Sequence, residues 1–164
     1  MTTLLEHKSE KHNEFLERII RDNLIRSLEV YRDNHPNNVR YWREFMFTLD
    51  GIKDKVKKFD IIASPDLIVY SEGPANLIFL EAKYSWTPGS KVEMRRQLLG
   101  YHNYVADNPE FLIDFLKKNG IASEAIDVVT IGFSGVTPTK SGGLREQVYF
   151  TLFQEEQVVT DYYL

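Results

Sequence analysis

The fold is decided by residues 65–83, PDLIVYSEGPANLIFLEAK. Two apolar runs, residues 67–70 and 77–80, flank a segment that is rich in turn-forming residues, 71–76. This pattern predicts a β-hairpin whose open end carries the charged residues Asp66, Glu81 and Lys83. The second run is apolar on both faces, which predicts a strand that is covered on both sides.

If the connection is a four-residue loop, residues 72–75, Ser71 pairs with Asn76 and Asp66 falls opposite Glu81. Directly opposed residues have Cβ atoms about 4.5–5.5 Å apart, so the two carboxylates repel each other. Lys83 lies on the same face as Glu81 and offsets part of this repulsion. A hard cation such as Mg²⁺, which binds carboxylate oxygens at about 2.0–2.1 Å, removes it. The alternative is that these residues form a solvated strand edge.

Composition narrows the class of protein. The chain has 164 residues, 43% hydrophobic and 27% charged, which predicts one ordinary globular domain with a full core. It contains no cysteine, which excludes disulfides, thiolate metal sites and a cysteine nucleophile. The sequence shows neither a membrane-length apolar stretch nor a signal peptide, so we expect a cytoplasmic protein without a membrane partner. A net charge of −4 neither indicates nor excludes nucleic-acid binding.

The flanking segments predict helices on either side of a mixed sheet. We expect a helix within residues 3–32 that is closed by Pro36, a strand over 45–49, a charged stretch over 53–58, and residues 59–63 leading into the hairpin. A capping box from Ser90 to Glu93 predicts a helix to about residue 106, with buried Met94, Leu98, Tyr101 and Val105.

Asn108 and Pro109 predict the start of a second helix that ends near Asn119. Residues 128–133 read as a buried strand, 137–143 as a polar loop and 147–153 as the last strand. This order predicts an α/β fold with a mixed central sheet flanked by helices.

Taken in order, these motifs resemble the PD-(D/E)xK nuclease superfamily. Pro65-Asp66, fourteen intervening residues and Glu81-Ala82-Lys83 match its signature, and Gln97-Leu98-Leu99-Gly100-Tyr101 on the next helix resembles the QxxxY motif of the RecB-like branch. The resemblance implies a restriction-endonuclease-like core (αβββαβ) and a single nuclease-like domain over residues 1–164. The iron–sulfur cysteines of some relatives are absent from this sequence.

The resemblance also implies roles for individual residues. Asp66, Glu81 and the Ala82 carbonyl would bind Mg²⁺ or Mn²⁺, and Lys83 would orient or deprotonate the attacking water. Gln97 and Tyr101 would point toward the site and the nucleic-acid backbone, although Tyr101 fits a core position equally well.

The opening helix supplies a further metal ligand in many relatives. Glu17 is the expected residue, with Glu14 and Glu10 as rivals. Phosphate contacts are expected from Lys91, Arg95 and Arg96, and also from the lysines of residues 53–58, unless that run is only a solvated face.

The implied function is that of a Mg²⁺-dependent deoxyribonuclease that hydrolyses phosphodiester bonds. Two alternatives stay open: a restriction-type or junction-resolving endonuclease of the same superfamily, and a non-catalytic nucleic-acid-binding module that keeps the fold. The expected partner is DNA, and a homodimer or a partner protein would supply specificity, because the chain has little room for a recognition domain.

Overall fold

The computed structural model describes residues 13–14, 16–17, 23–54, 60–85, 88–122, 126–138, 144–145, 147–152 and 160–163. Its helices are α2 (Ile25–Arg32), α3 (Pro88–Asp107) and α4 (Pro109–Lys118). Its strands are β1 (Asn37–Trp42), β2 (Phe45–Thr48), β3 (Gly51–Asp54), β4 (Ile61–Ala63), β5 (Leu67–Glu72), β6 (Asn76–Ser85), β7 (Asp127–Pro138), β8 (Leu144–Arg145), β9 (Gln147–Leu152) and β10 (Thr160–Tyr163). No helix in these ranges is long and apolar enough to cross a membrane.

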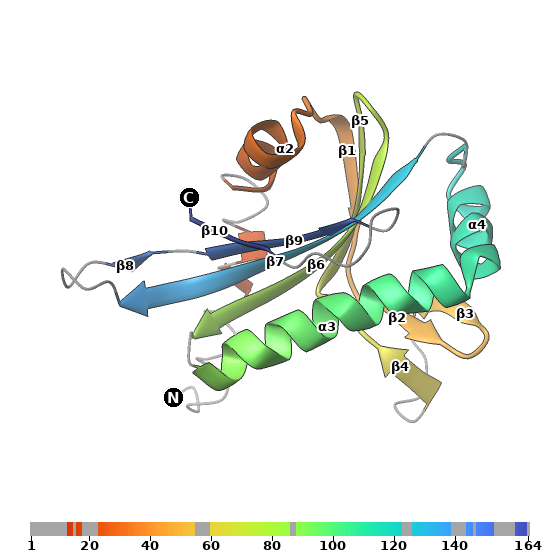
Figure 1. The fold of residues 1–164 in the computed structure, drawn as a ribbon. Helices are drawn as coiled ribbons and strands as arrows, with labels where there is room; N and C mark the ends of the chain where they lie inside the picture. Colours follow the sequence, from red (N-terminus) through yellow and green to blue (C-terminus); the bar gives the residue numbers. More distant parts are fainter. Residues whose placement is uncertain are drawn as a thin grey trace, which may run out of the picture.

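The main sheet is mixed, as the sequence predicts. Its strands run in the order β1-β5-β6-β7-β9-β10, with β8 paired to β7 (Figure 1). Strands β6 and β7 are parallel, and the other neighbours are antiparallel. The parallel pair needs a long crossover, which α3 and α4 supply. The α/β class and the mixed sheet are therefore confirmed.

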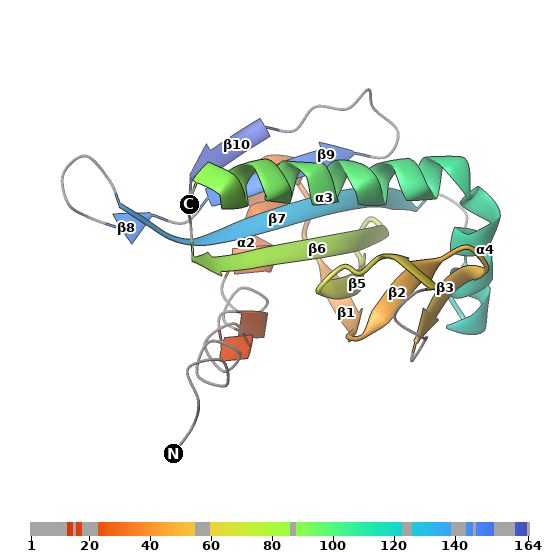
Figure 2. The same cartoon turned by 90° about the horizontal axis from the view of Figure 1, so that it is seen from below.

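Side-chain alternation along β6 divides the core into two layers. Leu77 and Phe79 point into one layer, with residues of α3 and α4, whereas Ile78 and Leu80 point into the other, with Leu28 of α2. Figure 2 shows α3 lying along β6 and β7. Because both faces of β6 are covered, its central residues are fully buried, as the continuous apolar run indicates.

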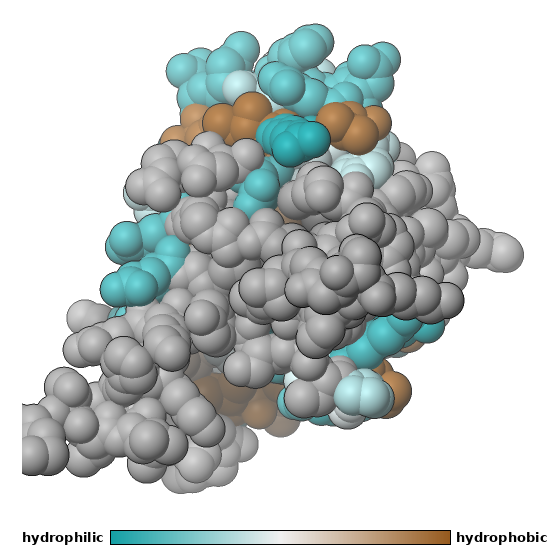
Figure 3. Space-filling model, turned by 90° about the vertical axis from the view of Figure 1, so that its left-hand side faces the viewer, coloured by the Kyte–Doolittle hydropathy of each residue, from teal (hydrophilic) through white to brown (hydrophobic). Residues whose placement is uncertain are grey.

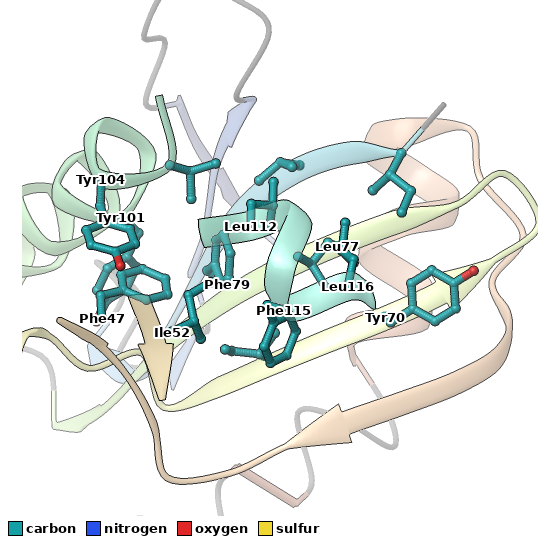
Figure 4. Close-up of a cluster of buried hydrophobic side chains, with 14 of the residues drawn as sticks. Phe47, Ile52, Tyr70, Leu77, Phe79, Tyr101, Tyr104, Leu112, Phe115 and Leu116 are labelled. Carbon is teal, nitrogen blue, oxygen red and sulfur yellow. The ribbon is translucent and has the colours of Figure 1, made fainter. Parts of the chain in front are cut away.

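A second, three-stranded sheet in the order β3-β2-β4 extends the first layer. Phe47 of β2 is fully buried; its ring stacks on Tyr104 at 4.3 Å and meets Tyr101 edge-on at 5.7 Å. Figure 4 shows this aromatic group beside Phe79. The small sheet therefore packs against α3, and β4 leads directly to Pro65 and Asp66.

Several sequence-based boundaries were wrong. Helix α3 begins at Pro88, so Ser90 lies inside its first turn and is not the N-cap; the proline at the first position fits a helix start. Residues 61–63 form the separate strand β4, and β7 continues through Thr137 to Pro138. Strand β9 is followed by β10 and is not the last strand. Strands β1 and β3 were missed because neither carries a run of apolar residues.

Other expectations were confirmed. Strand β2 lies where residues 45–49 predict a strand, and Met94, Leu98, Tyr101 and Val105 of α3 are all buried. Helix α4 starts at Pro109 and ends before Asn119. Helix α2 ends at Arg32, where Asp33 adopts a left-handed conformation. Most of the opening segment before residue 23 lies outside the described residues.

Candidate active site

The open end of the β5–β6 hairpin brings the predicted carboxylates together. Ser71 pairs with Asn76, and the ladder runs to Leu67 opposite Leu80, which is the register that the loop length predicts. Asp66 stands one position beyond this ladder, and its Oδ2 accepts a hydrogen bond of 2.8 Å from the Ala82 amide. Because β5 and β6 no longer pair beyond Leu67 and Leu80, the backbone amide of Ala82 is available to the Asp66 side chain.

Glu81 is buried at the same place, with 4% of its surface exposed. The Tyr101 hydroxyl lies 2.5 Å from Glu81 Oε2, to which it donates, and 3.1 Å from the Ser64 carbonyl oxygen. Lys83 Nζ lies 3.6 Å from Glu81 Oε1 on the same face of β6. One buried carboxylate is thus contacted by a hydroxyl from α3 and an ammonium from its own strand.

The surroundings of Glu81 favour its protonated form. Burial, followed by the nearby charge of Asp66, raises the pKa of Glu81 to about 8, although Tyr101 and Lys83 oppose the shift. Burial and the charge of Glu81 also raise the pKa of the Tyr101 hydroxyl, so it remains a hydrogen-bond donor. At neutral pH Glu81 therefore keeps a proton.

Gly132 of β7 allows α3 to approach this site. It pairs with Glu81 in the parallel ladder, and a Cβ at this position would lie 2.5 Å from Met94 Sδ and 3.1 Å from a Leu98 methyl carbon. A larger residue would force the Met94 and Leu98 side chains to move. Tyr101 lies on the same helix, and its hydroxyl reaches Glu81, the ladder partner of Gly132.

The QxxxY residues occupy different environments. Tyr101 is 2% exposed, and its hydroxyl contacts Glu81 from within the core. It is therefore not accessible to a nucleic-acid backbone, contrary to the contact that the resemblance implies. Gln97, one helical turn earlier, is half-buried, and its Oε1 is buried without a hydrogen-bond partner among the described residues. An acceptor in this position is suited to a donor on a ligand.

The basic residues of α3 differ in their accessibility. Lys91 and Arg95 are half-buried. Arg96 is exposed, and its Nη2 lies 3.8 Å from Glu93 Oε1. Of the residues 53–58, only Lys53 and Asp54 lie in the described part of the chain; Lys53 is exposed, with its Nζ 3.8 Å from Asp50 Oδ2.

Of the opening-helix glutamates, Glu14 and Glu17 are described, and neither is gathered with Asp66 and Glu81. Glu17 is exposed, with Oε1 3.9 Å from Arg43 Nη2, and its neighbour Leu16 packs on the face of β6 opposite to Glu81. Within the described ranges, no three His, Asp or Glu side chains come close enough to hold a metal ion. Glu14 is also exposed, and Glu10 lies outside these ranges.

The donor set nevertheless fits one hard cation. The N–H and C=O of a strand residue point to the same edge, so the Ala82 carbonyl faces the Asp66 side of β6. Two carboxylates and one backbone carbonyl are the oxygen ligands that Mg²⁺ and Mn²⁺ prefer. A cation here would also take the place of the proton that Glu81 holds.

Comparisons with protein families, curated proteins and solved structures found no match to this chain. The candidate site therefore rests on its residues and their geometry.

Two contributors to the site were missed in the sequence. Ser64 acts through its backbone carbonyl, which no side-chain pattern reveals. Gly132 does leave a signal, because an isolated glycine inside an apolar strand indicates the close approach of another element.

Proposed function

We propose that this chain is a metal-dependent nuclease that hydrolyses phosphodiester bonds in DNA. The observation that supports this most is the buried Glu81, which lies next to Asp66 and 3.6 Å from the ammonium of Lys83. A buried carboxyl group whose pKa is strongly raised is costly to ionise, and such groups concentrate at functional sites.

Each group has a role in such a reaction. Asp66, Glu81 and the Ala82 carbonyl would hold Mg²⁺ or Mn²⁺, which neutralises phosphate charge and lowers the pKa of water. Lys83 places a positive charge beside the carboxylates, where it holds a phosphate oxygen and orients the water. The water oxygen attacks phosphorus, the bond to the leaving oxygen breaks, and the proton released by water is balanced by one taken up by the leaving group.

Tyr101 and Ser64 position the site without touching the substrate. The hydroxyl of Tyr101 fixes one oxygen of Glu81, which leaves the other for Lys83. Gln97 Oε1 offers an acceptor to a group of the nucleotide, and the exposed Arg96 is available for a flanking phosphate.

The test is cleavage of linear, circular, single-stranded and branched DNA with Mg²⁺ or Mn²⁺. We expect the wild-type chain to cut at least one substrate, and Asp66→Asn and Glu81→Gln to lose at least 10³-fold in rate, because electrostatic stabilisation is typically the largest contribution to catalysis. Asp60→Asn, at an exposed carboxylate outside the site, is the matched control and should cut normally.

The same variants separate a nuclease from a non-catalytic binding module. Saturating Mn²⁺ should raise the melting temperature of the wild type and of Asp60→Asn, because a ligand of the folded state stabilises it. The rise should be absent in Glu81→Gln. Equal melting temperatures of the wild type with and without Mn²⁺, together with no cleavage, would contradict the proposal.

A further inference from the structure

A cleft of about 590 Å³ lies at the turn end of the hairpin, away from the carboxylate pair. Its walls come from β1, β5 and the segment after α4, and include Arg40, Tyr70, Glu72 and Ile121. Arg40 of β1 lies opposite Tyr70 of β5 in the ladder. Tyr70 is four residues from Asp66, so the cleft is about 13 Å along the strand from the carboxylate pair. The volume is within the usual range of small-molecule sites.

The cleft holds one carboxylate that is fixed by neutral donors. Glu72 Oε1 accepts a hydrogen bond of 3.1 Å from the Tyr70 hydroxyl, and Oε2 accepts one of 2.8 Å from Asn38 Nδ2. Asn38 reaches it from an irregular part of β1, where its φ is 47° and the register shifts. Burial raises the pKa of Tyr70, so its hydroxyl stays protonated and keeps donating.

The cleft also holds one guanidinium that is fixed by neutral acceptors. Arg40 Nη1 donates a hydrogen bond of 2.9 Å to the Asn119 carbonyl, and its guanidinium lies 5.1 Å from the centre of the Trp42 ring. The segment after α4 is held in turn by the Ile121 amide, which donates to the Leu116 carbonyl at 2.9 Å. Both charged groups therefore have neutral partners within the cleft.

Neither charge is neutralised by the other. Among the described residues, Arg40 and Glu72 have no oppositely charged group within 4.0 Å. A ligand with a single charge would be attracted by one group and repelled by the other. A ligand with both charges complements both, and the buried Ile121 with Ala122 gives its remainder an apolar contact.

We propose that this cleft binds a small zwitterion of the α-amino-acid class, with its ammonium on Glu72 and its carboxylate on Arg40. This site is separate from the carboxylate pair and does not depend on the nuclease proposal.

The test is an NMR titration of the full chain with L-leucine, N-acetyl-L-leucine and L-leucinamide as probes. L-Leucine should shift the amide signals of Gly120, Ile121 and Ala122. The other two probes each lack one charge and should bind at least about tenfold more weakly, because a hydrogen bond to a charged group is worth roughly 1.5–3 kcal/mol.

Variants test each charge separately. Arg40→Gln and Glu72→Gln should each weaken L-leucine binding about tenfold or more. Tyr70→Phe should weaken it by a smaller factor, because it frees Glu72 without removing its charge. Glu110→Gln, on the exposed first turn of α4, is the matched control and should bind like the wild type. Unmoved signals at about 50 mM L-leucine, or equal binding of all three probes, would overturn the proposal.

Discussion

The two ends of the β5–β6 hairpin bury polar groups in opposite ways. At the turn end, Ser71 and Asn76 are neutral, and the nearby Asp127 forms an ion pair of 2.8 Å with Arg32. At the open end, Asp66 and Glu81 face each other, and Lys83 is 3.6 Å from Glu81. The open end brings two carboxyl groups together, so a cation bound there can displace the proton that Glu81 holds.

The difference extends to the surface around the turn end. Figure 3 shows the left-hand side of Figure 1. Hydrophilic residues lie beside a hydrophobic strip at the top of this view, at the height where α2 lies in Figure 1. Ile25 and Val30 of α2 are 40% and 61% exposed. Helix α2 packs Leu28 into the core, and its Arg32 pairs with Asp127 beside the turn end.

The largest expected effect concerns Lys83 at the open end. Lys83→Ala should lower the rate of DNA cleavage about 10²–10⁴-fold, because a group that assists proton transfer is typically worth that much. Mn²⁺ should still raise its melting temperature, since the ligand oxygens remain. Lys83→Arg should not restore the rate, because a guanidinium differs in shape and stays protonated. Lys118→Ala on α4 is the control, and a near wild-type rate in Lys83→Ala would contradict the assignment.

The second effect is the contribution of Glu81, at the open end, to the pH dependence of stability. The pKa of Glu81 is about 8 in the folded chain and 4.5 in the unfolded one, so the unfolded state binds fewer protons between these values. The free energy of unfolding should therefore fall as pH rises from about 4.5 to 8, by about 2–4 kcal/mol without metal. Urea unfolding of wild type and Glu81→Gln measures this.

The control for that experiment lies at the turn end. Asp127→Asn should keep the slope of stability against pH, whereas Glu81→Gln should lose most of it. Equal slopes in the wild type and in Glu81→Gln would show that the carboxylate pair does not hold the extra proton.

Tyr101 supports the carboxylate that it contacts, and its removal should have a smaller effect. Its hydrogen bond lowers the pKa of Glu81, so Tyr101→Phe should raise that pKa further and make the proton harder to displace. Mn²⁺ affinity at neutral pH should fall about 10–100-fold, as is typical for loss of a group that orients a ligand. Tyr104→Phe removes a hydroxyl that donates a hydrogen bond to the Thr48 carbonyl, outside the site. This control should bind Mn²⁺ like the wild type.

The smallest effect is expected at the turn end. Asp127→Asn should cost about 1 kcal/mol of unfolding free energy, because the Arg32–Asp127 pair is partly exposed and such pairs contribute little. Metal affinity and cleavage should not change. Chemical unfolding of the variant gives the first quantity, and a loss of cleavage would mean that the two ends are coupled.

The sequence by itself determined the hairpin, its register and the convergence of Asp66, Glu81 and Lys83. It could do so because a strand alternates with a fixed period of two and a four-residue loop fixes the pairing. It likewise determined the buried stripe of α3 and the limits of α4, since these depend on local spacing and on Asn108, Pro109 and Asn119.

Only the tertiary structure decided what surrounds Glu81. The contact from Tyr101, the Ser64 carbonyl and the close approach at Gly132 join segments that lie far apart in the sequence. The separate sheet containing β4 and the position of Glu17 away from the pair were also beyond local patterns. The spacing of residues within one element does not tell which face of another element they will contact. The raised pKa of Glu81 therefore depended on tertiary packing.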